Sequence, residues 1–142
     1  MRGMSSQPVD YVCEVDRDLP VSQQTIWWIQ PQTGDDATRW MSGYGAAVQE
    51  KRSGRREMNV DKANRINRER WSKTVTKVQN FWLNDGMHVK EVTTADNSEI
   101  YWEIYRQLEP AALLEIFEGS LSYSQLTESK KKKLSMGSSF PS

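Results

Sequence analysis

Apolar and polar positions alternate in three short stretches of this 142-residue chain. Residues 10–15 and 25–29 are rich in β-prone side chains, and a loop that contains Pro20 separates them. Residues 87–93 alternate in the same way after a turn signal at 84–86. A period of two is typical of strands that bury one face. The pattern predicts two paired strands and a third strand that returns to them.

Two longer stretches show helical spacing. Thr33 and the acidic residues after it favour a helix start, and that helix is expected to run through Val48. A polar break at 51–57 predicts an exposed loop, after which Asn59 can cap a long helix that reaches about Leu83. Four apolar residues of this second helix lie four, three and four positions apart: Trp71, Val75, Val78 and Trp82. This spacing predicts one apolar stripe along the helix.

Two shorter helices are expected in the last third of the chain. Residues 96–99 open the first, in which Ile100, Ile104 and Leu108 share a face. Pro110 suits the first turn of the second, and Gly119 ends it. The elements together predict an α+β fold, with a small antiparallel sheet of about three strands packed with three to four helices.

The chain is long enough for one domain with its own core. We expect an N-terminal arm at 1–8, a single α+β domain at 9–119, and a C-terminal helix end with a polar tail at 120–142. Both termini are expected to be extended because neither carries enough apolar residues to form a core of its own.

The aromatic residues are more informative about function than the overall composition. Hydrophobic residues make up only 37% of the chain, but it contains six Trp. Trp27 and Trp28 are neighbours in a predicted strand and point to opposite faces, so both cannot enter one core. Trp102 lies away from the apolar face of its helix. The predicted protein-interface residues are Trp27, Trp28, Trp102, Tyr105 and Phe117; the alternative is that a second layer of the same domain covers these rings.

Charge is balanced overall but separated along the chain. The formal net charge is zero, whereas residues 51–77 carry ten basic and three acidic side chains, a net +7. Residues 91–118 carry seven acidic side chains and one basic, a net −6. The basic segment could contact phosphate, face the acidic segment, or orient the docking of copies or partners. Its candidate contact residues are Arg52, Arg55, Arg56, Arg65, Arg68 and Lys73.

Few residues are available for catalysis. His88 and Cys13 are the only histidine and cysteine, so a zinc cluster of His and Cys ligands is excluded. We expect a small buried thiol and an exposed strand histidine rather than a nucleophilic pair. Four carboxylates at helical spacings are expected to be solvated rather than catalytic: Glu99, Glu103, Glu115 and Glu118. The sequence predicts no enzyme, no cofactor and no metal site.

A membrane span or a targeting signal is not expected either. No stretch approaches the roughly 20 apolar residues that a membrane span needs. Residues 1–7 carry one arginine and no apolar run, so neither a signal peptide nor an anchor is expected there. A lone cysteine suits a reducing compartment.

Two pairs of segments resemble a known group of proteins. The first pair is 11–20 (YVCEVDRDLP) with 24–31 (QTIWWIQP), and the second is 108–116 (LEPAALLEI) with 124–128 (SQLTE). The combination resembles small tailed-bacteriophage proteins encoded among head and tail morphogenesis genes, some of them described as tail-assembly-chaperone-like. The basic middle of the chain has no counterpart in this resemblance.

The resemblance implies a virion structural or assembly protein of the head, neck or tail, acting by protein contacts and located in the virion or the host cytoplasm. Its partners would be other phage structural proteins in an oligomeric assembly without a membrane. Two alternatives stay open: a transient tail-assembly chaperone, and a small nucleic-acid-binding protein that uses residues 51–77.

Overall fold

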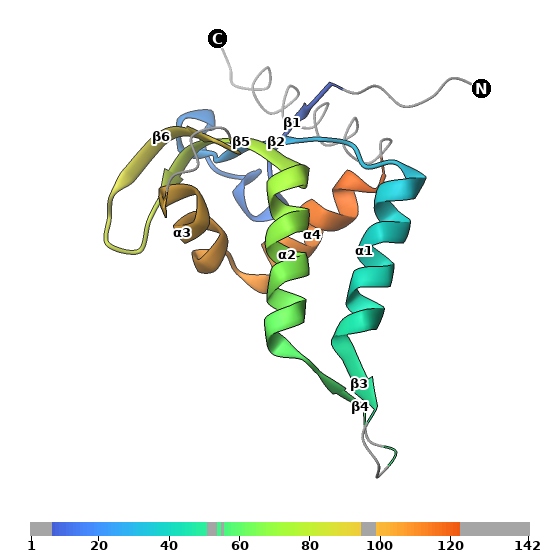
Figure 1. The fold of residues 1–142 in the computed structure, drawn as a ribbon. Coiled ribbons are helices and arrows are strands. Elements are labelled where there is room, and N and C mark those ends of the chain that lie inside the picture. The colour runs from blue at the N-terminus through green and yellow to red at the C-terminus, as the bar shows by residue number, and fades with distance from the viewer. Residues whose placement is uncertain (1–6, 51–53, 55, 95–98, 123–142) are drawn as a thin grey trace, which may run out of the picture.

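Four strands form an antiparallel sheet in the computed structural model, which describes residues 7–50, 54, 56–94 and 99–122 (Figure 1). Across the sheet the order is β1 (Val9–Tyr11), β2 (Ile26–Ile29), β5 (Val75–Trp82) and β6 (His88–Thr93). Neighbouring strands are antiparallel throughout. The predicted α+β fold is confirmed, and the sheet has one strand more than expected.

The two predicted N-terminal strands pair with each other, with Tyr11 opposite Trp27. The predicted third strand is present as β6, but it pairs with β5 instead of with β1 or β2. Trp27 lies opposite Val78 of β5, and Val78 lies opposite Val92 of β6. This row of side chains crosses the whole sheet and forms its buried face.

The prediction of one long helix from Asn59 to Leu83 is wrong in its second half. Helix α2 (Val60–Thr74) begins at the expected cap, where the Asn59 side chain accepts a hydrogen bond from the backbone N–H of Lys62. It ends at Thr74, and β5 follows directly. The residues 74–76 are all β-branched, which favours a strand, and β5 forms ladders with both β2 and β6.

A bulge explains why the spacing of the valines looked helical. Trp28 lies opposite Lys77 and Ile29 lies opposite Val75, so Thr76 is one residue too many on β5. An extra residue reverses the alternation locally. Val75 and Val78 are three positions apart and are nevertheless both buried, which imitates one face of a helix.

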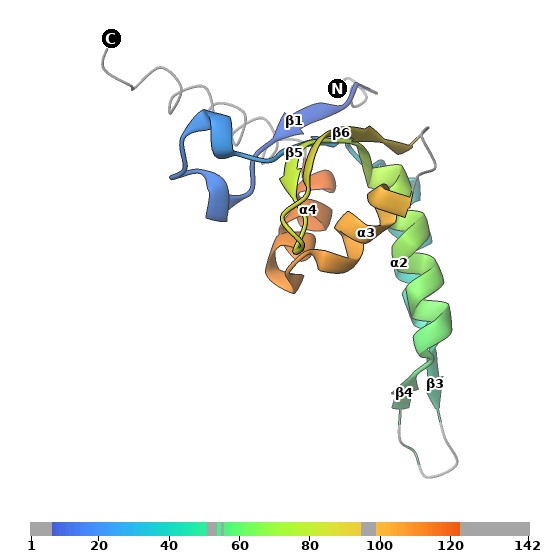
Figure 2. The ribbon, with the colours of Figure 1, turned by 90° about the vertical axis from the view of Figure 1, so that its left-hand side faces the viewer.

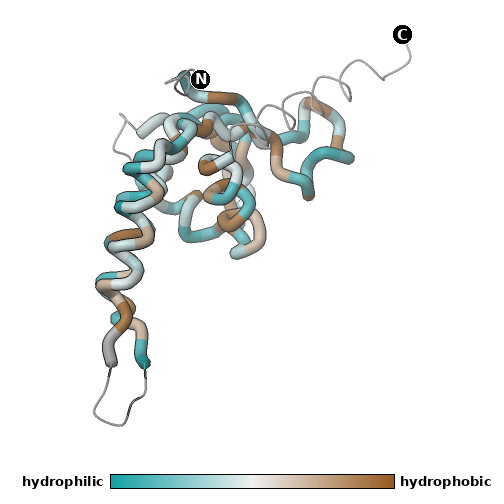
Figure 3. Tube along the Cα trace, turned by 90° about the vertical axis from the view of Figure 1, so that its right-hand side faces the viewer, coloured by the Kyte–Doolittle hydropathy of each residue, from teal (hydrophilic) through white to brown (hydrophobic). Residues whose placement is uncertain are grey.

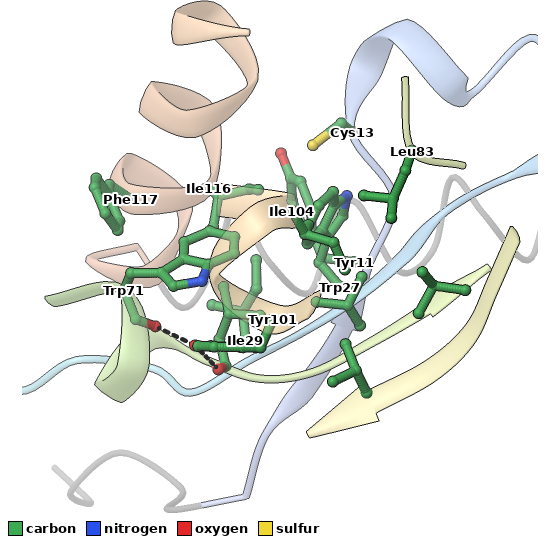
Figure 4. Close-up of a cluster of buried hydrophobic side chains, with 14 residues drawn as sticks. Tyr11, Cys13, Trp27, Ile29, Trp71, Leu83, Tyr101, Ile104, Ile116 and Phe117 are labelled. Atoms are coloured by element: carbon green, nitrogen blue, oxygen red, sulfur yellow. Dashed lines mark hydrogen bonds between the residues drawn. The ribbon is translucent and has the colours of Figure 1, made fainter. Parts of the chain in front are cut away.

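Helices α3 (Glu99–Gln107) and α4 (Pro110–Ser120) pack against the buried face of the sheet (Figure 2). The core between them centres on Trp71, whose ring makes edge contacts with Trp27 at 5.8 Å and with Phe117 at 6.3 Å (Figure 4). Such pairs add about 0.5–1.5 kcal/mol each beyond the burial of area. The Tyr101 hydroxyl donates to the carbonyls of Trp71 and Val75, at 3.1 and 3.0 Å, and thereby ties α3 to the junction of α2 and β5.

A helical arm projects from this body. It consists of α1 (Gly34–Ala47), the two-stranded hairpin of β3 (Val48–Glu50) and β4 (Arg56–Met58), and α2. Figures 1 and 2 show α1 and α2 side by side, with the hairpin at the far end of the arm. The expected cap of α1 is confirmed, because Thr33 and Asp36 form a reciprocal capping box. The hairpin replaces part of the loop predicted at 51–57.

The last helix extends one residue past the expected stop at Gly119. The buried Ser120 closes α4, and its carbonyl accepts from the backbone N–H of Gln32, which fastens α4 to the start of α1. Of the predicted arm at 1–8, only Gln7 and Pro8 belong to the described residues. Most of the predicted tail, residues 123–142, lies outside them.

Candidate protein-interaction site

A groove of about 370 Å³ opens between the loop after β1, the end of β5 and the corner where α3 meets α4. The loop contains two short 3-10 turns, η1 (Glu14–Asp16) and η2 (Val21–Gln23). We call this surface the groove. Its apolar lining includes Val15, Leu19, Trp82, Leu108 and Ala112. Val15 is 73% exposed and lies beside other exposed apolar side chains. Exposed apolar side chains that gather in one patch often mark an interaction site.

The loop that forms one wall of the groove is fixed by polar contacts. The Asp16 carboxylate accepts from the backbone N–H of Thr25 at 3.1 Å. The Gln24 amide donates to the carbonyl of Leu19 at 3.0 Å. Asn80, whose φ is 64°, reaches across from β5 and donates to the carbonyl of Gln24 at 2.9 Å. The wall is therefore organised before any partner binds, which lowers the entropic cost of binding.

Trp82 forms the opposite wall and is 44% exposed. Its ring stacks on His88, with centroids 4.5 Å apart and planes at 21°. His88 in turn lies 2.6 Å from the Asn80 side-chain oxygen. These contacts hold a large aromatic ring at the surface in one orientation, as interface anchors require. Sequence reasoning placed Trp82 in a helical stripe and missed this role, although its position just before the turn at 84–86 was a usable signal.

The base of the groove contains the single thiol. Cys13 is buried, and burial, followed by the charge of the nearby Glu115 and Asp16 carboxylates, raises the pKa of its thiol well above the ordinary value. A protonated thiol is a poor nucleophile. The expectation of a small buried thiol and an exposed strand histidine is confirmed, since Cys13 is buried and His88 is exposed on β6.

Glu115 differs from the expectation of a solvated carboxylate. It accepts a hydrogen bond from the Tyr11 hydroxyl at 2.6 Å and from the backbone N–H of Glu14 at 3.1 Å. It thereby anchors η1 to α4. Glu99 and Glu118 are exposed as expected, and Glu103 lies within 3.1 Å of the Arg106 guanidinium.

A second cavity, of about 260 Å³, lies between α2 and α3, and we call it the α2–α3 cleft. Its lining consists of Asn64, Arg68, Trp102, Tyr105 and Arg106. The Arg68 guanidinium lies 4.4 Å from the ring centroid of Trp102. Burial raises the pKa of the Tyr105 hydroxyl, so this group stays neutral. The structure thus brings two predicted interface aromatics next to a predicted electrostatic residue.

Comparison with models of known protein families, with curated proteins and with solved structures found no match. Within the described residues, no group of three or more His, Cys, Asp or Glu side chains is placed to hold a metal ion. The same part of the chain contains no helix that is both long and apolar enough to cross a membrane.

The other predicted interface aromatics lie in two different places. Trp27 and Phe117 belong to the core, so the prediction that they meet a partner is wrong for this structure. Trp28 lies half-buried on the opposite face of the sheet. Its indole N–H donates to the Gln79 side chain at 2.9 Å, and the Lys77 ammonium lies 4.6 Å from its ring centroid. The two neighbouring indoles are separated as strand geometry requires.

The predicted basic contact residues are also divided. Arg56 and Arg65 are exposed along the helical arm. Lys73 lies 3.8 Å from the Glu69 carboxylate and is partly neutralised. Arg52 and Arg55 lie outside the described residues. Among the described residues, an ion pair joins the basic and acidic segments, between Lys77 and Glu91 at 3.5 Å.

Proposed function

We propose that this chain is a non-catalytic assembly protein that binds other protein chains through the groove, as a structural or assembly protein of a tailed bacteriophage. The observation that carries the proposal is the exposed, immobilised Trp82 beside the apolar groove. Tryptophan is enriched at the energetic centres of protein interfaces, and single exposed apolar residues elsewhere on a surface carry no such meaning.

The size and lining of the groove support a peptide or loop as its ligand. A volume of about 370 Å³ accommodates a few side chains. Its lining combines apolar side chains, Val15 and Leu19 among them, with the acidic Asp16 and Glu109. Specific protein interfaces likewise combine apolar and polar side chains.

The phage context comes from the two resembling segment pairs. The first pair includes the loop and β2, and the second includes the α3–α4 corner, so both contribute to the groove region. In this proposal the partners are other phage structural proteins, and the protein acts in the virion or the host cytoplasm. A transient tail-assembly chaperone would use the same surface but leave the finished particle.

Size-exclusion chromatography with light scattering, of the full chain alone and with purified head or tail proteins, tests the proposal. We expect a complex that Trp82→Ser weakens roughly tenfold or more. Met41→Ser is the matched control, because Met41 is 74% exposed on α1 and lies outside the groove. Failure of the unmodified chain to bind any of these proteins would contradict the proposal. Mass spectrometry of purified virions then separates a structural protein from a chaperone.

One observation favours a second function. The α2–α3 cleft combines the arginines Arg68 and Arg106 with the aromatic Trp102, the combination that single-stranded nucleic-acid sites use for phosphates and bases. A salt titration of DNA binding checks it. Binding through this cleft would weaken steeply with salt and with Arg68→Ala, and absence of binding would remove this alternative.

A further inference from the structure

The charged side chains that line the groove are acidic. Asp16 of η1 and Glu109, at the start of α4, contribute carboxylates, and no lysine or arginine is among the lining residues that the structure describes. Glu14 and Asp18 lie on the same loop as Asp16 and are exposed. The groove therefore presents a negative surface to a partner.

Two positive groups lie close to these carboxylates in the chain, and neither cancels them. The side chain of Arg17 is only 16% exposed, and its guanidinium lies 3.9 Å from the carboxylate of Glu115, with which it pairs. The N-terminus of α4 carries about half a positive charge, which is less than the full charge of Glu109 at its cap position. The negative field also reaches the base of the groove, since the charges of Glu115 and Asp16, after burial, help to raise the pKa of the Cys13 thiol.

Trp82 adds an aromatic surface that attracts cations. An ammonium or guanidinium group is drawn to the face of an indole ring. Trp28 and Trp102 already have a cation of this chain over the ring, at 4.6 and 4.4 Å from its centroid. In the described part of the chain no lysine or arginine lies over Trp82, whose side chain is 44% exposed. The Trp82 ring is therefore open to a cation of a partner.

The same groove can bury apolar side chains of a partner. Its own apolar side chains come from the loop after β1 and from the α3–α4 corner: Val15, Leu19, Leu108 and Ala112. Figure 3 shows both hydrophobic and hydrophilic positions on that loop. Burial of apolar area supplies most of the affinity in such a site, whereas complementary charge fixes orientation and speeds the encounter. A segment that matches both features has an apolar side chain next to a basic one.

We propose that the groove binds a basic segment of a partner protein, with an apolar side chain in the groove and a neighbouring lysine or arginine against Glu109, Asp16 or the Trp82 ring. The inference rests on the proposed function and names the chemistry of the partner segment. An acidic segment would bring like charges together, which disfavours it.

Three synthetic peptides of equal length test the inference with the full chain. The first has leucines flanked by lysines, the second has glutamates in place of the lysines, and the third has serines in place of the leucines. Fluorescence anisotropy of the labelled peptides measures each affinity, and Trp82→Ser identifies the binding that takes place in the groove. Glu109→Gln removes one charge of the groove. Glu118→Gln is the matched control, because it removes the same charge from an exposed position near the other end of α4.

The peptide with leucines and lysines is expected to bind roughly tenfold more tightly than the other two, and to lose most of this affinity with Trp82→Ser. Glu109→Gln should weaken its binding roughly two- to fivefold, the effect of one exposed charge pair, and added salt should reduce that difference. Glu118→Gln should bind the peptide as the unmodified chain does.

An acidic peptide that binds the groove as tightly as the basic one overturns the inference. Equal effects of Glu109→Gln and Glu118→Gln overturn it as well, and so does the absence of binding by all three peptides. Each of these results leaves the proposed function standing if the same preparation binds a head or tail protein through Trp82. Conversely, binding of the basic peptide in the groove without binding to any such protein supports the basic segment and contradicts the proposed partner.

Discussion

At the scale of single residues, the buried Cys13 makes stability depend on alkaline pH. The folded state raises the pKa of its thiol far above the ordinary 9.0. Above that value the unfolded chain loses the proton while the folded chain retains it, so the free energy of unfolding falls as the pH rises. The full stabilisation is present below pH 9, and the slope approaches about 1.4 kcal/mol per pH unit above it.

Urea unfolding of the unmodified chain and of Cys13→Ala, at several values from pH 7 to 10, checks this expectation. The variant should lose stability at neutral pH because it leaves a small cavity, but its curve should be flatter above pH 9. Tyr101, whose pKa burial also raises, contributes in both proteins. Equal slopes for the two proteins above pH 9 would show that Cys13 titrates normally.

The tryptophans show which properties of single residues could be predicted from the sequence. Neighbouring side chains in a strand point to opposite faces, which predicts that Trp27 and Trp28 lie on different faces of the sheet. The structure confirms this. The alternation could not say which of them enters the core, because that depends on where the helices pack. The spacing of Trp82 to Val78 predicts that both lie in one helical stripe, but Trp82 is the most exposed indole among the described residues. The exposure of a side chain at the end of a strand depends on the turn that follows, and a count of helical spacings takes no account of that turn.

At the scale of elements, the caps and turns were predictable because their chemistry is local. Thr33, Asn59 and the turn at Gly86, whose φ is +90°, occur where the sequence indicated. The end of α2 was not predictable from spacing, because the bulge in β5 imitates a helical period. The choice between helix and strand at 75–82 was decided by pairing with β2, which is distant in the sequence, as well as with β6, which follows after a short turn.

Two glycines of α1, Gly43 and Gly45, lead to a prediction about the packing of α1 against α2. A Cβ at Gly43 would lie 2.6 Å from the Cδ1 atom of Ile66 on α2, whereas a Cβ at Gly45 would meet nothing within 4 Å. Alanine favours a helix over glycine by about 1 kcal/mol. Gly45→Ala should therefore raise the free energy of unfolding by up to that amount. Gly43→Ala should lower it, because the Ile66 side chain, which approaches with three of its carbon atoms, must shift to make room.

Thermal and urea unfolding of the two variants measure the difference. Gly43→Ala combined with Ile66→Val should recover part of the loss, since the shorter side chain removes the closest atom. The close approach of the helices is disproved if Gly43→Ala is as stabilising as Gly45→Ala.

At the scale of the whole molecule, the sequence predicted the fold class but not the surfaces. The groove combines a loop from the first quarter of the chain with Trp82 and the α3–α4 corner, so it arises from contacts that no local pattern contains. The α2–α3 cleft is similar, although both Arg68 and Trp102 were individually predicted as contact residues. Charge separation along the chain predicts distinct fields, and where such fields lie in space depends on the projection of the arm.

The projection of the arm leads to a last prediction, in hydrogen exchange. Amides of the hairpin of β3 and β4 should exchange far faster than those of β5, because β4 is exposed throughout and the hairpin opens without unfolding the four-stranded sheet. Mass spectrometry of deuterium uptake by the full chain measures the two rates. The central strands β2 and β5 serve as an internal reference, since each of them pairs with a strand on both sides. Equal rates in the hairpin and in β5 would mean that the arm opens only when the body unfolds.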